Sequence, residues 1–340
     1  LCQHARNANE HGYQPYVGIP ELREAFAKWY KTWYDVDLNS KTEIQPLIGS
    51  KEGILHISLA FLNPGDEVLI PDPAYLAYPA CVSIAHGVPV LVPTYAKDEF
   101  RLTVEELEKK VTPKTKAILI GYPNNPTGTI MDRASLEKVA AFAKAHDLIV
   151  IADEIYCDLT YEGQHTCFAS LPDMQERTIV LNGFSKSYAM TGLRIGYVCA
   201  PREALEEIYK VHQYEILCAS TTSQYGAIEA LRSCDDDVKA MYEEYAARRE
   251  MIYQGLVDMG LTVFKPKGAF YIFPDISCTG MDEEEFCDRL LTEEKVGVVP
   301  GTCFGPQGRN HIRISYAASR ENIAEALKRM ARFVKKYKKA

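Results

Sequence analysis

Short apolar runs rich in β-branched residues alternate with helical patterns through the first two-thirds of the sequence. Apolar runs of this kind are typical of buried strands, and the segments between them have the spacing of amphipathic helices. The predicted strands are Glu67–Pro71, Val88–Val92, Ala117–Tyr122, Leu148–Asp153 and Thr178–Gly183. The predicted helices are Lys51–Leu62, Val104–Val111 and Arg133–His146, the last with Asp132 as its N-cap. This alternation predicts an α/β fold with a mostly parallel central sheet and helices on both faces.

The last third of the chain has a different pattern. Asp235–Met259 is long, charged and helical, and we expect it to lead from the sheet into a second, smaller domain. That domain would contain the segment Leu261–Ile276, a helix around Glu283–Leu291, the strand His311–Ser315 and a basic C-terminal helix. We therefore predict a large domain at residues 1–240 and a small α+β domain at residues 241–340.

Composition and charge exclude several classes of function. The 340 residues are 47% hydrophobic and 25% charged, which allows a sizeable core without metals or disulfides. The net charge of -8 argues against a nucleic-acid partner, and no apolar run is long enough to span a membrane. The ten cysteines form no CxxC pair and no zinc spacing with histidine. We therefore expect free thiols, a cytoplasmic location and no bound metal.

The segment NGFSKSYAMTGLRIGY, Asn182–Tyr197, follows a predicted strand and says most about chemistry. It places Lys186 just past the strand, with Ser185 beside it and Arg194 eight residues on. A lysine amine can attack an aldehyde, and a nearby hydroxyl and guanidinium can hold a phosphate dianion. Most lysines are exposed loop residues, and this segment alone allows that interpretation as well.

Two further motifs lie at the carboxyl ends of predicted strands, where α/β sheets place their ligands. In YPNNPTG, residues 122–128, two prolines and a glycine predict a tight turn from which an Asn side chain can donate to a phenolate oxygen. In IADEIY, residues 151–156, Asp153 can pair with a protonated pyridine nitrogen. Asp153 could also simply cap the next helix.

A fourth motif, LIGSKEG at residues 47–53, opens the helix predicted from Lys51. Free backbone N–H groups at a helix start, with Ser50 and Lys51, form a potential anion site. A glycine-serine N-cap explains the same residues without a ligand.

These four motifs, in this order, resemble those of the class I and II aminotransferases, pyridoxal-phosphate enzymes of fold type I. The resemblance runs from about Gly12 to the C-terminus. Its most specific part is the SKxxxMTGxRxGY run, with NNPTG and DEIY upstream of it. It implies pyridoxal 5'-phosphate as the cofactor.

The resemblance also implies a role for each residue. Lys186 would hold the cofactor as a Schiff base and move the proton between the substrate Cα and the cofactor C4′. Asp153 would pair with the pyridine nitrogen. The other cofactor-binding residues would be Ser50, Lys51, Ser185 and Arg194 at the phosphate, Asn125 and Tyr156 at the ring oxygen, and Tyr75 stacked on the ring. Tyr75 could equally be a core tyrosine.

Two more residues match family motifs outside this set. Arg313, in the apolar strand HIRISYA, would grip the substrate α-carboxylate, with Asn125 as a second substrate-binding residue. Tyr13, in GYQPYVG, would reach the phosphate in the neighbouring subunit's site, which implies a homodimer with shared active sites. Relatives usually carry several dozen residues before this motif, whereas eleven precede Gly12, so we expect an N-terminal arm to be missing.

The function implied is transamination between an L-amino acid and a 2-oxo acid, with 2-oxoglutarate as the expected acceptor, in a ping-pong cycle. No arginine lies in His212–Thr221, where aspartate enzymes of one subgroup bind the distal carboxylate, so aspartate, alanine, aromatic and diaminopimelate-like donors stay open. One alternative keeps the cofactor and Lys186 but makes the protein a C–S β-lyase. Another is a non-catalytic sensing domain, against which the complete set of Lys186, Asp153 and Arg313 argues.

Overall fold

The computed structural model describes residues 1–339, and within them the larger sheet has seven strands in the order β1-β7-β6-β5-β4-β2-β3. The strands are β1 (Ile44–Leu47), β2 (Glu67–Asp72), β3 (Val88–Pro93), β4 (Thr115–Gly121), β5 (Ile149–Asp153), β6 (Thr178–Gly183) and β7 (Gly196–Cys199). Strands β2 to β6 pair in parallel, and β7 is antiparallel to both β1 and β6. The predicted mostly parallel sheet is therefore confirmed.

Two strands of this larger sheet, β1 and β7, were not predicted from the sequence. Both are four residues long, β1 contains Pro46, and β7 begins at Gly196, so neither has the long β-branched run of the other strands. They pair with each other, with Leu47 opposite Gly196. Strand β7 lies beside β6 and β1 lies beside β7, so the two strands extend the sheet beyond β6. Both of these pairings are antiparallel.

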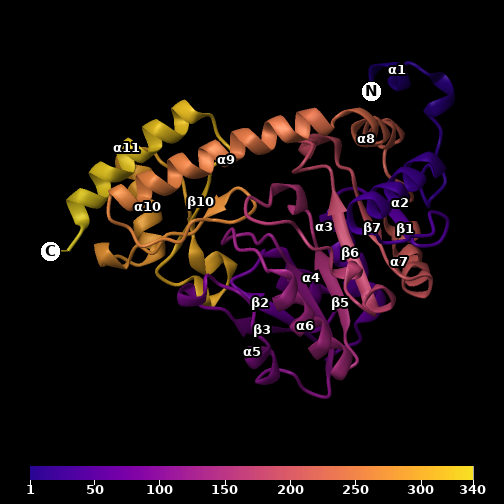
Figure 1. The fold of residues 1–340 in the computed structure, drawn as a ribbon, viewed down its shortest axis with the longest axis horizontal. Coiled ribbons are helices and arrows are strands. Elements are labelled where there is room, and N and C mark those ends of the chain that lie inside the picture. Colours follow the sequence, from indigo (N-terminus) through magenta and orange to yellow (C-terminus); the bar gives the residue numbers. More distant parts are fainter. Residues whose placement is uncertain (340) are drawn as a thin grey trace.

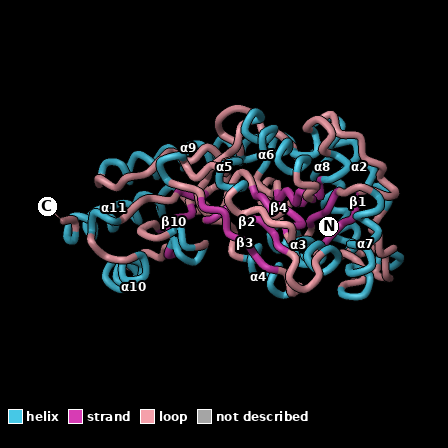
Figure 2. Tube along the Cα trace, turned by 90° about the horizontal axis from the view of Figure 1, so that it is seen from below, coloured by secondary structure: helices cyan, strands magenta, loops and turns pink. Residues whose placement is uncertain are grey.

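Helices cover both faces of this sheet, as Figure 2 shows from below. Side chains alternate between the faces, so Leu119 and Ile151 pack toward one layer while Ile118 and Val150 pack toward the other. The first layer contains α3 (Ser50–Phe61), α4 (Ala77–Ile84) and α7 (Arg202–Glu215). The second contains α2 (Pro20–Tyr34), α5 (Val104–Glu108), α6 (Arg133–Ala145) and α8 (Thr221–Ser233).

The helix boundaries follow local signals. The Asp132 side chain accepts a hydrogen bond from the Ser135 N–H at 2.8 Å, which confirms the predicted N-cap of α6. The helix predicted to reach Val111 ends instead at Glu108. Pro113 lies shortly beyond, and a proline disfavours helical backbone in the residue before it.

The long helix α9 (Asp235–Asp258) runs from the large sheet to the C-terminal part of the molecule, as Figure 1 shows. There a small antiparallel sheet in the order β8-β10-β9 packs with two helices. The elements are β8 (Tyr271–Ile272), α10 (Glu283–Glu294), β9 (Val299–Pro300), β10 (Ile312–Ser315) and α11 (Arg320–Tyr337). The predicted boundary at residue 240 falls inside α9, and the division into two domains stays a prediction.

A short helix, α1 (Cys2–Ala5), precedes α2 at the amino end.

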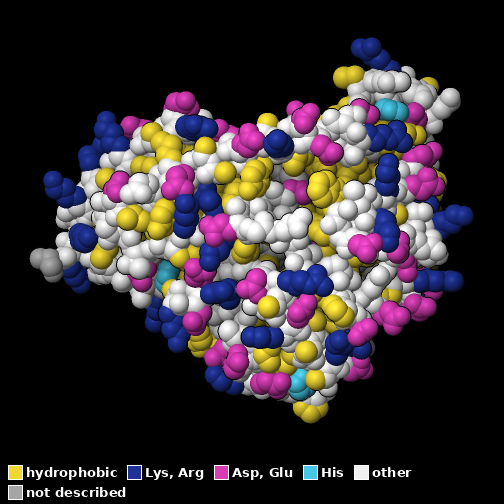
Figure 3. Space-filling model, in the orientation of Figure 1, with side chains coloured by type: hydrophobic (Ala, Val, Ile, Leu, Met, Phe, Trp, Pro, Cys, Tyr) yellow, Lys and Arg dark blue, Asp and Glu magenta, His cyan; other side chains and the backbone are white. Residues whose placement is uncertain are grey.

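Lysine and arginine side chains are interspersed with aspartate and glutamate over the face seen in Figure 3. That face has no continuous basic stripe of the kind that binds nucleic acid. None of the described helices is both long and apolar enough to cross a membrane.

Candidate active site

The predicted motifs meet in one cavity of about 450 Å³ at the carboxyl ends of β4, β5 and β6. The start of α3, the segment around Tyr75 and Tyr78, and strands β8 and β10 supply its other walls. Of the predicted site residues, the lining includes Ser50, Lys51, Tyr75, Asn125, Asp153, Tyr156, Ser185, Lys186, Arg194 and Arg313. Residues up to 263 positions apart in the sequence are thus brought together, as expected for the carboxyl edge of a parallel sheet.

Lys186 follows β6 and lies between aromatic rings. Its Nζ atom is 5.8 Å from the centroid of the Tyr156 ring and 5.5 Å from that of Phe270. Burial lowers the pKa of Lys186, and the nearby Arg194 lowers it further. Both effects favour the neutral amine, which is the nucleophilic form.

Asp153 ends β5 and is buried. The Tyr78 hydroxyl donates to its Oδ2 at 2.9 Å, and the Ile155 N–H donates to its Oδ1 at 3.3 Å. Burial raises the pKa of Asp153 to about 6, and the Tyr78 hydrogen bond opposes that rise. A cation placed in the cavity beside this carboxylate would favour its charged form.

The other end of the cavity is built to receive an anion. Gly49, with φ of 81°, precedes α3, so the first backbone N–H groups of the helix lie beside Ser50 and Lys51. The Arg194 guanidinium donates to the Thr191 carbonyl at 3.0 Å and reaches toward the Ile48 carbonyl. The positive φ of Gly49 is one that L side chains rarely adopt, and a Cβ atom there would also push against the Arg194 guanidinium, so glycine is favoured at this position.

Arg313 comes from the small sheet and contacts the turn after β4. Its Nη1 donates to Asn125 Oδ1 at 2.9 Å, while its Nε has no hydrogen-bond partner among residues 1–339. The guanidinium lies 4.7 Å from the Tyr271 ring centroid and 4.6 Å from that of Phe304. Because the Tyr271 and Phe304 rings accept no conventional hydrogen bond, N–H groups of the Arg313 guanidinium stay free to bind a planar anion such as a carboxylate.

Sequence reasoning missed two aromatic residues of this site. Tyr78, which donates a hydrogen bond to Asp153, lies three residues after Tyr75 in DPAYLAY, and this spacing of two tyrosines was the only signal. Tyr271 lines the cavity and shares a 3.0 Å hydrogen bond between hydroxyls with Tyr156. Tyr13 is 86% exposed and is not among the residues that line the cavity.

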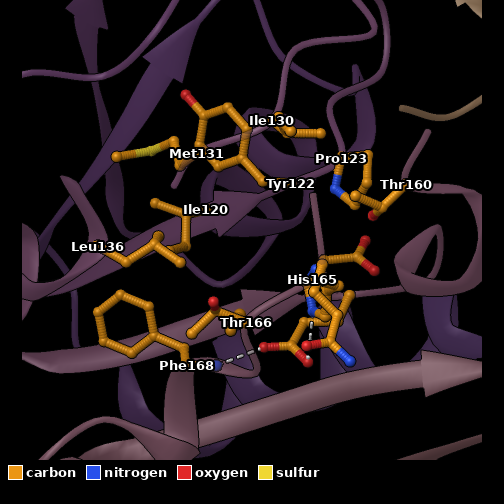
Figure 4. Close-up of a pocket in the computed structure, with 14 residues that line it drawn as sticks. Ile120, Tyr122, Pro123, Ile130, Met131, Leu136, Thr160, His165, Thr166 and Phe168 are labelled. Carbon is orange, nitrogen blue, oxygen red and sulfur yellow. Dashed lines mark hydrogen bonds and ion pairs between the residues drawn. The ribbon is translucent and has the colours of Figure 1, made fainter. Parts of the chain in front are cut away.

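A second, smaller cavity lies near the end of β5, between Tyr122, Met131 and Phe168 (Figure 4). Its volume of about 20 Å³ is enough for one water molecule. The Phe168 N–H donates to Glu154 Oε1 at 2.7 Å, and His165 Nε2 lies 3.1 Å from Glu154 Oε2. Glu154 therefore anchors the following loop, while its neighbour Asp153 lines the larger cavity.

The sequence matches the family model described as "Aminotransferase class I and II" over residues 2–330. An aspartate aminotransferase of Pyrococcus abyssi is 46% identical, and the match covers 99% of this chain and 88% of the relative. The chain belongs to the class I and II aminotransferases. An aromatic-amino-acid aminotransferase of Thermococcus litoralis is 44% identical, with the same coverage of both chains.

Solved structures of other class I and II aminotransferases share the fold. An aromatic aminotransferase from Pyrococcus horikoshii has a TM-score of 0.96 at 45% identity, covering 98% of this chain and 90% of that one. An aspartate aminotransferase from Thermus thermophilus, in a structure with maleate, has a TM-score of 0.93 at 37% identity, covering 97% and 87%. The predicted fold type I is thereby confirmed.

Aminotransferases of these classes use pyridoxal phosphate, and the cavity of this chain suits that cofactor. It offers an amine of lowered pKa at Lys186, a buried carboxylate at Asp153 and an anion cradle between Gly49 and Arg194. An aldehyde, a basic ring nitrogen and a phosphate are the three complementary groups of the cofactor.

Proposed function

We propose that the chain transfers an amino group from an L-amino acid to a 2-oxo acid, with 2-oxoglutarate as acceptor, by a ping-pong mechanism. The observation that carries this proposal is the cavity that holds Lys186 together with Asp153 and Arg313. These residues offer an amine, a carboxylate and a guanidinium in the lining of one cavity. A proton-transfer group, a partner for a cationic ring and a carboxylate receptor are what transamination requires.

Each residue would act on a stated atom. When bound, pyridoxal phosphate supplies the electron sink that stabilises charge at the substrate Cα. Lys186 would hold the cofactor covalently and then move the proton between the substrate Cα and the cofactor C4′. Asp153 would keep the ring nitrogen protonated, because a buried carboxylate favours a neighbouring cation. Arg313 would orient the substrate through its α-carboxylate.

The remaining lining residues would hold the cofactor in place. We propose that Ser50, Lys51, Ser185 and Arg194 bind the phosphate, because all four line the cavity whose wall includes the start of α3 with its free N–H groups. Asn125 and Tyr156 would donate hydrogen bonds to the ring oxygen. Asn125 would also contact the substrate, because its Oδ1 accepts a hydrogen bond from Arg313, the proposed carboxylate-binding residue. Tyr75 would stack on the ring, a role that its place in the cavity wall supports.

We further propose a homodimer and a cytoplasmic location. Tyr13 is almost fully exposed within one chain, so a second chain could receive it at its phosphate site. The ten cysteines are free thiols, which suits a reducing compartment.

A survey of half-reactions tests the function. Purified protein saturated with pyridoxal phosphate is mixed with single amino acids, and conversion of the cofactor to its amine form is followed by absorbance. We expect conversion with at least one amino acid, and recovery of the starting spectrum on addition of 2-oxoglutarate. Release of pyruvate and ammonia without amino transfer would make the protein a β-lyase instead. Binding without any conversion would indicate a sensing domain.

Tyr78→Phe is expected to narrow the pH range of cofactor binding. The Tyr78 hydroxyl lowers the pKa of Asp153 by donating to Oδ2, so its loss raises that pKa above the value of about 6. Asp153 then becomes neutral at a higher pH and no longer pairs with a ring cation. The dissociation constant of pyridoxal phosphate, measured by fluorescence from pH 5 to 8, should rise on the acid side first. Equal curves for variant and wild type would show that Tyr78 does not set the charge of Asp153.

A further inference from the structure

A cluster of two histidines and one glutamate lies away from the cavity, between helices α3 and α7, which pack against each other. Glu52 and His56 come from α3, one helical turn apart, and His212 comes from α7. Glu52 Oε1 is 3.3 Å from His56 Nδ1 and 2.7 Å from His212 Nδ1. One donor atom from each residue lies within 4.8 Å of the other two.

The cluster is buried and has more donor atoms than its hydrogen bonds use. Both imidazoles are fully buried, and Glu52 is 9% exposed. Neither ring nitrogen of His56 makes a well-directed hydrogen bond to any residue in the described part of the chain. Across residues 1–339, no lysine or arginine pairs with Glu52 or with the nearby Glu215. Two carboxylates therefore face two imidazoles without a permanent cation.

We propose that Glu52, His56 and His212 form a binding site for a divalent transition-metal ion of the Zn²⁺ type. Zinc takes nitrogen and oxygen ligands at about 2.0–2.2 Å, which places tetrahedral donors about 3.3–3.5 Å apart. The 3.3 Å and 2.7 Å separations from Glu52 to the two histidines reach that spacing with a shift of less than an ångström. The two histidines, whose donor atoms lie within 4.8 Å of each other, would also move together when the ion binds. Imidazole ligands favour zinc over calcium or magnesium, which prefer oxygen.

Two outer contacts have the form expected around a metal site. Glu215 Oε2 lies 2.9 Å from His56 Nε2, so a carboxylate faces the nitrogen that would point away from the ion. The second oxygen of Glu52 accepts a hydrogen bond from the Ile48 N–H at 2.5 Å. Ligating histidines and carboxylates are commonly fixed by such partners.

The ion would fasten α7 to the start of α3, directly beside Ser50 and Lys51. Glu52, His56 and His212 supply three ligands, so a water molecule would complete the tetrahedron. The proposal differs from the sequence-based expectation of no bound metal. The sequence did not reveal this site because His212 lies 160 residues after Glu52, and no local spacing connects the two. It is independent of the proposed amino transfer.

The test titrates cofactor-loaded protein, first cleared of metal with a chelator, with Co²⁺ and then with Zn²⁺. We expect one saturable Co²⁺ per chain with a visible ligand-field band, no sulfur-to-cobalt charge transfer, and displacement by Zn²⁺. Glu52→Gln and His212→Gln should each abolish the band. Glu215→Gln, which keeps all three ligands, should weaken binding by about 10- to 100-fold.

His146→Gln is the matched control, because His146 is a surface histidine 3.3 Å from a glutamate, Glu108. It should bind Co²⁺ as the wild type does. Circular dichroism of each metal-free variant shows whether it folds, and Glu215→Gln keeps the test decisive if a core variant does not. The proposal is overturned if wild-type protein shows no saturable band, or if folded Glu52→Gln and Glu215→Gln bind as tightly as wild type.

Discussion

Lys186→Ala is expected to abolish the visible absorbance of the cofactor-bound protein and to lower kcat on the order of 10⁴- to 10⁶-fold, as loss of a covalent catalytic group typically does. The amine lies in the same cavity as Asp153, the carboxylate proposed to face the ring nitrogen. Removing it takes away both the covalent attachment and the proposed base at the substrate Cα. Absorbance spectra and single-turnover rates measure the two losses separately.

Two variants control for charge and for general damage. Lys186→Arg keeps a cation in the cavity but cannot form the covalent bond, so it should lose the same absorbance. Lys144→Ala removes a surface lysine near Asp173 and should change neither quantity. If Lys186→Ala kept an undiminished visible band, another amine would be the attachment point and the assignment would be wrong.

Much of this site was predictable because its residues lie at the ends of apolar strands. Asp153 ends the run Ile149–Asp153, Lys186 comes shortly after the run Thr178–Gly183, and the carboxyl ends of parallel strands meet at one edge. The contacts between these residues were not predictable in the same way. The Tyr78 hydrogen bond to Asp153 joins positions 75 residues apart, and no sequence period connects them.

Strands β1 and β7 show a different limit of sequence reasoning. Their pairing is decided by the open edge of β6 and by burial of Ile44 and Tyr197 against α2, and not by propensity. Tyr13 is a different case: the sequence resemblance predicts its role in another chain's site, and its 86% exposure within a single chain leaves that role a prediction.

The position of Arg313 depends on how the C-terminal part meets the large sheet. The Ala74 N–H donates to the Phe304 carbonyl at 2.9 Å, and Asp72 accepts from the Gln307 N–H at 3.2 Å. These bonds join the end of β2 to the loop whose Phe304 ring packs on the Arg313 guanidinium. Arg313 can therefore present free donors to a substrate while its body is held by aromatic contacts.

Arg313→Ala is expected to lower kcat/KM for the amino-acid substrate by about 10²- to 10³-fold, because a buried, charge-assisted pair is typically worth about 2–5 kcal/mol when one partner is removed. The dissociation constant of pyridoxal phosphate should change little, since Arg313 contacts Asn125 and aromatic rings and lies apart from the anion cradle at Gly49. Steady-state kinetics and cofactor titration report the two quantities independently.

Arg313→Lys tests the geometry of the guanidinium separately from its charge, because lysine keeps the charge but not the planar fork that binds two carboxylate oxygens. It should recover only part of the loss, mainly through KM. Arg309→Ala removes an exposed arginine four residues earlier and should behave as wild type. If Arg313→Ala weakened cofactor and substrate binding equally, the arginine would act on the shape of the cavity as a whole. Its unpartnered Nε would then have to be explained without a substrate carboxylate.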